Sequence, residues 1–268
     1  MDSSSNDNMS FLEHLEELRW HIIRSLIAII SAGFICFLMK DFIFDTIIFG
    51  PKKMDFPTYK FLCQAATFIG VETTFCGDEF PFIVQNRTMA GQFSAHVMTS
   101  IISGFIISFP YILYEFWKFI SPGLLEKEKA KSRGFIFISS MLFFIGVLFG
   151  YYIISPLSIN FLGTYQVSSQ VLNEIDLGSF ISLVRSSAIA SGIIFELPII
   201  IYFLTKAGVV TPESLVKYRK YALVLVLVLA AIITPPDVAS QIIVAIPIVV
   251  LYQVSIFISR IVVKNQAK

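Results

Sequence analysis

Hydrophobic residues gather in long runs along this chain, and short polar segments separate the runs. A helix rises 1.5 Å per residue, so it needs about 20 apolar residues to cross a hydrocarbon core of about 30 Å. No segment alternates over about ten residues as the strands of a membrane barrel do, so each run is predicted to be helical. Six runs are expected to cross a membrane, over residues 22–39, 93–116, 135–154, 180–203, 221–233 and 242–261.

The fifth run is the shortest of the six. As a helix, residues 221–233 rise only about 20 Å, which is less than the hydrocarbon thickness. We expect this helix either to include its polar flanks or to lie where the bilayer is thinned.

The positions of the basic residues predict the orientation of the spans. An N-terminus in the cytoplasm places the clusters at 127–133 and 217–220 inside, together with the basic residues at both ends of the chain. The positive-inside rule therefore predicts an all-α polytopic protein with both termini in the cytoplasm. Outside remain five basic residues spread thinly over one long loop, namely Lys40, Lys52, Lys53, Lys60 and Arg87.

That long loop covers residues 40–92 and leads into the second span. It is polar and rich in turn residues, and we expect it to form an extracytoplasmic cap on a single integral membrane domain over residues 1–268. Cys63 and Cys76 both lie in it, and an oxidising compartment would allow them to pair. Spacing alone does not show whether their Cα atoms approach within about 7 Å, so the sequence leaves the disulfide open.

Composition supports a membrane protein and excludes several other classes. Hydrophobic residues make up 56% of the chain and charged residues 15%, against about 25% charged in ordinary soluble domains. The net charge of +1 is too small to indicate nucleic-acid binding. The acidic N-terminus is unlike a cleaved signal peptide. The cysteines lack companions at metal-ligand spacing and no Walker-type loop is present, so no metal, nucleotide or other cofactor is expected.

Two polar stretches flank the predicted spans on the cytoplasmic side. In "HLEELRWHIIR", residues 14–24, Glu17 stands close to the first span. In "SPGLLEKEKAKSR", residues 121–133, Glu128 stands among lysines. The simpler interpretation is a solvated acidic face, with Glu16 paired to Arg19, and a positive-inside loop. The functional alternative is a pair of carboxylates that bind guanidinium groups at the membrane surface.

Glu196 in "FELP" lies near the middle of the fourth predicted span. Because hydrocarbon disfavours a charged carboxylate, we expect Glu196 to be protonated or hydrogen-bonded to a neighbouring helix. Pro198 removes a helical hydrogen bond and predicts a kink.

The stretch "TPPDVASQ" separates the last two spans. Two prolines end the fifth span after Thr234, and Asp237 is the expected N-cap of the sixth. A tight hairpin explains most of this pattern. Gln241, one turn further on, is also placed to bond to a helix of a second protein.

The ordered motifs "HLEELR", "FWKFISPGL" followed by Glu128, "FELP" and "TPPDVASQ" resemble the TatC family, the multispanning subunit of the twin-arginine protein translocase. The resemblance covers residues 14–261. It implies a concave, glove-like bundle of six helices in the cytoplasmic (inner) membrane that is not an enzyme. It further implies a receptor for twin-arginine signal peptides, homo-oligomeric in its complex, which exports folded proteins with the proton-motive force. Its implied partners are single-span subunits of the TatA and TatB types.

The resemblance also assigns roles to residues at matching motif positions. The chain departs from the family at His21, where a basic residue is frequent, at Lys127, where histidine is frequent, and in its longer first loop. The implied signal-peptide-binding residues are Glu17, Arg19, Phe119 and Glu128; the implied intramembrane polar residue is Glu196; and the implied partner-binding residues are Thr234, Asp237 and Gln241.

Two other functions compete with this interpretation. Glu196 and Pro198 would suit a proton- or ion-coupled transporter of small molecules, but the chain lacks the internal repeat and paired broken helices of such proteins. His96 and Ser103 would suit an intramembrane protease. They lie about 10 Å apart along one helix, however, and no G-x-S-x-G elbow is present.

Overall fold

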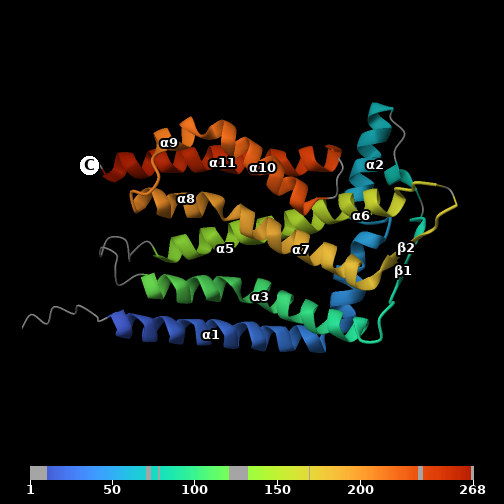
Figure 1. The fold of residues 1–268 in the computed structure, drawn as a ribbon, viewed down its shortest axis with the longest axis horizontal. Helices are drawn as coiled ribbons and strands as arrows, with labels where there is room; N and C mark the ends of the chain where they lie inside the picture. Colours follow the sequence, from blue (N-terminus) through green and yellow to red (C-terminus); the bar gives the residue numbers. More distant parts are fainter. Residues whose placement is uncertain are drawn as a thin grey trace, which may run out of the picture. The chain divides into compact units, whose positions relative to one another are not determined.

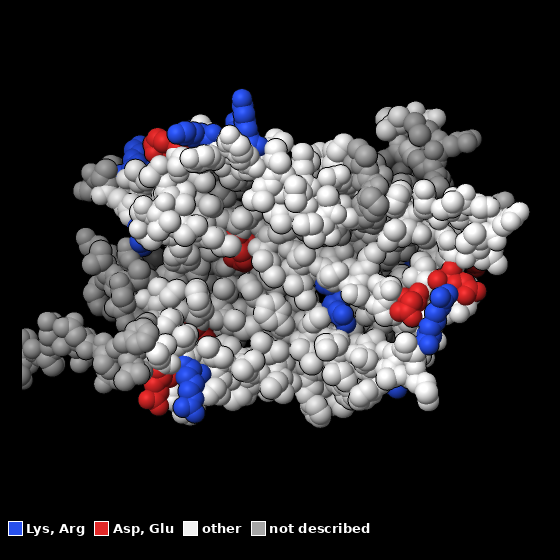
Figure 2. Space-filling model, in the orientation of Figure 1, with Lys and Arg blue, Asp and Glu red and all other residues white. Residues whose placement is uncertain are grey.

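The computed structural model describes residues 11–70, 74–77, 79–120, 132–168, 170–234 and 238–266. Long helices dominate this part of the chain, and most charged side chains on the face in Figure 2 lie over helix ends and loops. The helices of the apolar runs are α1 (Phe11–Leu38), α3 (Gly91–Ile120), α5 (Ser132–Phe149), α6 (Ser155–Thr164), α7 (Leu177–Phe195), α8 (Leu197–Lys206), α10 (Arg219–Ile233) and α11 (Val238–Gln266) (Figure 1).

Five segments among the described residues are long and apolar enough to cross a membrane. They match five of the six predicted spans, with α5 and α6 joined through the π-helical turn η5 (Gly150–Ile154) and α7 joined to α8. The sixth prediction corresponds to α10, whose 15 residues rise only about 22 Å. Six crossings, the orientation of the termini and the glove-like shape therefore stay predictions. The five segments are Leu15–Leu38, Gly91–Ile120, Gly134–Thr164, Leu177–Lys206 and Ser240–Gln266.

The chain forms two compact units. The first unit comprises Met1–Leu38 with Ser100–Ser140, and the second comprises Met39–Thr99 with Met141–Lys268. The boundaries fall within α3 and α5, so two helices contribute to both units. Each unit has its own packing and is described by itself.

In the first unit, α1 and α3 pack against each other in antiparallel directions. A Cβ atom added at Gly104 of α3 would lie 2.5 Å from the backbone nitrogen of Gly33 and 2.6 Å from the carbonyl oxygen of Ile29, so only glycine permits this approach. One turn further along α3, the hydroxyl of Ser108 donates a hydrogen bond to the carbonyl of Ala28 at 3.0 Å. Small side chains thus bring the two backbones together.

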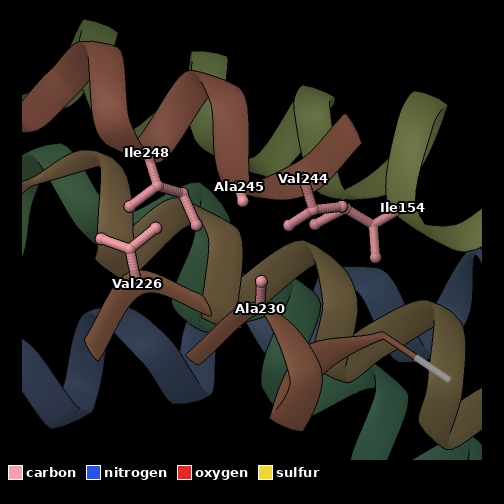
Figure 3. Packing of buried hydrophobic residues seen from close by; sticks show 6 residues of the cluster. All are labelled: Ile154, Val226, Ala230, Val244, Ala245 and Ile248. Atoms are coloured by element: carbon pink, nitrogen blue, oxygen red, sulfur yellow. The ribbon is translucent and has the colours of Figure 1, made fainter. Parts of the chain in front are cut away.

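In the second unit, the apolar core forms where α10, α11 and η5 meet (Figure 3). Because only four residues connect α10 to α11, the two helices run antiparallel, and Figure 1 shows them side by side. The buried cluster comprises Ile154, Val226, Ala230, Val244, Ala245 and Ile248.

The predicted loop over residues 40–92 contains regular structure of its own. A short parallel pair joins β1 (Phe82–Gln85) to β2 (Asn173–Asp176), with Phe82 opposite Asn173. The other elements of this segment are the π-helical η1 (Phe42–Ile48), the 3₁₀ turn η2 (Gly50–Lys52), helix α2 (Pro57–Ile69) and the 3₁₀ turn η3 (Thr74–Cys76).

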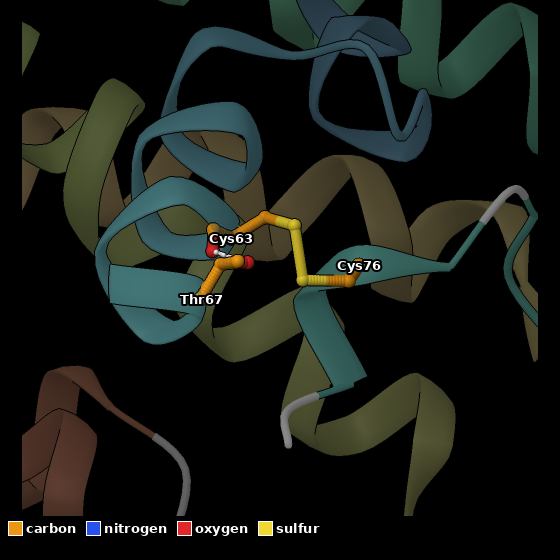
Figure 4. Close-up of a disulfide and its surroundings, with 3 residues drawn as sticks. All are labelled: Cys63, Thr67 and Cys76. Atoms are coloured by element: carbon orange, nitrogen blue, oxygen red, sulfur yellow. Dashed lines mark hydrogen bonds between the residues drawn. A yellow bond between two sulfur atoms is a disulfide. The ribbon is translucent and has the colours of Figure 1, made fainter. Parts of the chain in front are cut away.

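A disulfide closes this segment between α2 and η3. Cys63 and Cys76 are bonded with their Cα atoms 5.1 Å apart (Figure 4), which settles the pairing that the sequence leaves open. The hydroxyl of Thr67 donates to the carbonyl of Cys63 at 2.8 Å.

Tyr59 of α2 anchors the same segment. Its side chain is fully buried, and its hydroxyl lies 2.8 Å from the carbonyl oxygen of Pro51 and 3.0 Å from that of Pro156. Burial raises the pKa of Tyr59 well above its usual range, so the hydroxyl stays neutral and donates. Helix α2 is therefore hydrogen-bonded to α6 and disulfide-bonded to η3.

Candidate functional site

A buried acidic residue, Glu115 of α3, is the centre of a polar cluster in the first unit. Glu115 is only 2% exposed, and the Nδ1 atom of His21 on α1 lies 2.6 Å from its Oε2 atom. At this distance the two side chains share a hydrogen bond, whose donor is set by the tautomer of His21 and the protonation of Glu115. The Nη1 atom of Arg24 lies 3.7 Å from the same oxygen. Two basic side chains of α1 thus compensate the buried carboxylate, which would otherwise be costly.

Glu17 and Phe119 adjoin this cluster. Glu17 precedes His21 by one helical turn and lies on the same face of α1. Its Oε2 atom is buried and has no hydrogen-bond partner among the described residues. Phe119 follows Glu115 by one turn, and its ring packs edge-on against that of His21, with centroids 6.1 Å apart. His21 therefore contacts both Glu115 and Phe119, one turn from Glu17.

Two other predicted residues are less closely associated with this cluster. Arg19 is exposed and lies about 200° around the axis of α1 from Glu17. Neither Glu16 nor Arg19 takes part in an ion pair within the described part of the chain, so the expected Glu16–Arg19 pair is wrong. Glu128 lies outside the described residues, and its association with Glu17 stays a prediction.

Sequence reasoning missed Glu115. The signal was present in "YEFWKF", where a carboxylate lies within the second predicted span and four residues before Phe119. An ionisable residue inside a span is a candidate for function by the rule that singled out Glu196. The partnership with His21 was not visible, because the two residues are 94 positions apart.

Glu196 lies at the break between α7 and α8 in the second unit. Its backbone N–H caps α7 through the carbonyls of Ile193 and Ile194, and Pro198 follows in the first turn of α8. The predicted interruption at "FELP" is confirmed. The side chain is 8% exposed, and its neighbours Ile194 and Leu197 pack against the apolar core.

Thr234 and Gln241 are both tied to α10. The Thr234 hydroxyl is buried and donates to the carbonyl of Ala230 at 2.9 Å. The Gln241 side-chain amide on α11 donates to the carbonyl of Leu227 at 3.0 Å. The Gln241 bond joins α11 to α10, whereas the Thr234 bond stays within α10, and contact of either residue with a partner subunit stays a prediction. Asp237 lies outside the described residues.

The second unit also contains a cavity of about 1370 Å³ that no sequence pattern predicted. Its walls come from η1 and η2, from the first turns of α3 and from α7, and they include Lys40, Asp45, Lys53 and His96. Within the described residues, no group of three or more histidine, cysteine or acidic side chains could hold a metal ion.

Apolar helices long enough to cross a bilayer, with acidic side chains buried among them, define this chain as a multi-pass membrane protein. The sequence model of the family described as "Sec-independent protein translocase protein (TatC)" matches residues 13–247. The chain belongs to the TatC family. It is therefore a component of a protein translocase rather than an enzyme, and the transporter and protease alternatives are set aside.

Relatives match almost the whole chain. The TatC protein of Blattabacterium sp. subsp. Periplaneta americana is 46% identical over 264 residues, covering 98% of this chain and 99% of its own. The Aquifex aeolicus protein is 36% identical over 261 residues, covering 96% and 98%. A crystal structure of the twin-arginine translocase receptor TatC has a TM-score of 0.69 and 32% identity, covering 94% of this chain and all of that chain. The same receptor in DDM has a TM-score of 0.70 and 36% identity, covering 91% and 98%.

Proposed function

We propose that this chain binds twin-arginine signal peptides at its cytoplasmic face and, with TatA- and TatB-type subunits, exports folded proteins using the proton-motive force. The observation that carries the proposal is Glu17, whose buried Oε2 atom has no hydrogen-bond partner among the described residues. Leaving a buried carboxylate oxygen without a donor is costly. An arginine guanidinium supplies paired donors that match a carboxylate, so a bound signal peptide would satisfy Glu17.

The remaining predicted residues complete the proposed receptor surface. Phe119 supplies an aromatic surface beside His21, Arg19 extends the first motif, and Glu128 supplies the second carboxylate. Two unit charges 4 Å apart attract by about 4 kcal/mol at an effective dielectric constant of 20, before the cost of desolvation. Two such contacts would select a pair of arginines while allowing the peptide to leave.

The membrane arrangement follows from charge and from the family. The basic residues favour both termini in the cytoplasm, which places the 40–92 segment outside the cytoplasmic (inner) membrane. The hairpin that carries Thr234, Asp237 and Gln241 would then lie near the extracytoplasmic surface as the docking edge for single-span subunits. We further propose that several copies of the chain assemble in the receptor complex.

The test compares Glu17→Ala with Glu16→Ala, because Glu16 is the exposed acidic neighbour on the same helix. Protein in nanodiscs is titrated with a fluorescent twin-arginine signal peptide, and export of a folded reporter is measured in cells. Glu17→Ala should weaken peptide binding at least tenfold, about 1.4 kcal/mol, and reduce export, whereas Glu16→Ala should leave both near wild type. A lysine-lysine peptide should bind the wild type less tightly than the arginine pair. Equal binding by the two variants would contradict the proposal.

A further inference from the structure

We propose that Glu115 is a positioning residue for the signal-peptide site, and that its hydrogen bond to His21 sets the register of α1 so that Glu17 is held beside Phe119. This inference rests on the proposed function, because it concerns how the same site is presented to the peptide. Glu115 is enclosed by its own helix pair and contacts basic groups of this chain, so it is not itself a peptide contact.

The contacts between α1 and α3 run in one register along the pair. Gly104 packs against Gly33, Ser108 bonds to Ala28, and Glu115 bonds to His21, so positions ascend on α3 as they descend on α1. Among the described contacts, the His21–Glu115 bond is the one nearest to Glu17. Only one helical turn separates His21 from Glu17, so fixing His21 also fixes where Glu17 stands.

A polar bond at this position supplies selectivity that apolar packing lacks. The contact between Gly104 and Gly33 fixes the register in the middle of the pair, about 18 Å along α1 from His21, and a slip of α1 by one turn, about 5.4 Å, would disturb it. The same slip would separate His21 from Glu115 and leave a carboxylate that is 2% exposed without this hydrogen bond. Buried polar pairs add little net stability, but they penalise alternative registers strongly.

Other polar groups support Glu115 without replacing His21. Arg24 lies 3.7 Å from Oε2, but its side chain is 51% exposed, so its contribution is screened by solvent. The Tyr111 hydroxyl, one turn earlier on α3, also hydrogen-bonds to Glu115. His21 is the buried partner on the opposite helix, and it also packs against Phe119. At the end of α1 near Glu17, the His21–Glu115 bond therefore fixes the register, while the Gly104–Gly33 contact fixes it further along the pair.

The test is a double-mutant cycle between Glu115→Gln and Glu17→Ala, with the dissociation constant of the labelled twin-arginine peptide as the readout. Glutamine keeps an oxygen that can accept from His21 but removes the charge that strengthens the bond, so Glu115→Gln should weaken binding about fivefold to tenfold and lower the preference for arginine over lysine in the peptide. If Glu115 acts through Glu17, the double variant should bind no more weakly than Glu17→Ala alone. A purely structural role predicts independent effects that multiply.

Substitutions at His21 provide a second measurement if Glu115→Gln folds poorly. His21→Arg keeps a donor toward Glu115 and should retain peptide affinity within about twofold, while His21→Leu should lose about as much as Glu115→Gln. Ser108→Ala is the matched control, since it removes another bond between α1 and α3 but lies further from Glu17 and should leave affinity unchanged.

The outcomes separate this inference from the function on which it rests. Multiplicative losses in the cycle, wild-type affinity of a folded Glu115→Gln protein, or equal affinities of His21→Arg and His21→Leu would overturn the positioning role while leaving the receptor function intact. Wild-type binding by Glu17→Ala would instead overturn the proposed function itself.

Discussion

At the scale of single residues, three buried carboxyl groups occupy different environments in this protein. Glu115 has hydrogen-bond partners in its own chain, and Glu17 has an oxygen without a donor among the described residues. Glu196 occupies a break between two helices beside an apolar core. Burying an acidic side chain within a membrane span costs free energy. Such a residue is tolerated where a hydrogen-bond partner or a functional role offsets that cost. Environment, rather than residue type, therefore distinguishes the positioning, binding and intramembrane roles that we propose.

The role of Glu196 is tested by comparing Glu196→Leu with Glu196→Gln. Both variants remove the charge, but glutamine keeps hydrogen-bonding groups of similar size in the buried site. If polarity within the membrane is required, export of a folded reporter should fall at least tenfold for leucine and stay within about threefold of wild type for glutamine. Protein levels in the membrane control for stability. Normal export by Glu196→Leu would make this residue merely structural.

At the scale of elements, the position of the end of α1 that carries Glu17 depends on how closely α1 packs against α3. The approach is limited by backbone atoms, because a Cβ at Gly104 would lie within 2.7 Å of three backbone atoms of α1. Backbone cannot move aside as the end of a flexible side chain can. A substitution in the middle of the helix pair should therefore shift α1 relative to α3 along the whole length of the pair.

Gly104→Ala should destabilise the protein by about 1–3 kcal/mol through overpacking. The matched control is Gly134→Ala in α5, because a Cβ there meets nothing within 4 Å. Alanine is also the better helix former by about 1 kcal/mol, so the control should be neutral or stabilising. Thermal unfolding of both variants in nanodiscs measures the difference. Equal unfolding temperatures would contradict the close packing of α1 and α3.

At the scale of the whole molecule, the number of crossings decides where the C-terminus lies. Five segments meet the length of a span, and α10 is too short alone, but its residues Val226 and Ala230 pack into the core formed with α11. Core packing beside a spanning helix favours α10 as a sixth crossing with its polar flanks or a thinned bilayer. Six crossings return the C-terminus to the side of the N-terminus, and five do not.

Reporter fusions distinguish the two topologies. With six crossings, green fluorescent protein fused after Lys268 should fluoresce and alkaline phosphatase at the same position should be inactive, because the basic C-terminus stays in the cytoplasm. Phosphatase fused after Lys60, in the segment expected outside, is the positive control. An active phosphatase at the C-terminus would show that α10 does not cross.

Much of the fold was predictable because hydrophobic runs of span length have few alternatives in a bilayer. Five runs lie within helical segments long enough to span, although the first begins seven residues before its predicted start and the third ends ten residues after its predicted end. A helix boundary falls at Glu196, close to the kink that Pro198 predicted. The regular structure of the 40–92 segment was not predicted, since it depends on pairing with distant residues such as Asn173 and on the hydrogen bond from Tyr59 to Pro156.

The sequence by itself determined the membrane class, five of the helical segments, the family and the first carboxylate of the proposed site, because these depend on local hydropathy and on short motifs. Only the tertiary structure decided that Cys63 bonds to Cys76, that Gly104 meets Gly33, and that His21 hydrogen-bonds to Glu115. Such contacts depend on how separate segments pack, and no local pattern records which distant residue will stand opposite. The site combines both kinds of information, since a motif supplies Glu17 and packing between helices sets its surroundings.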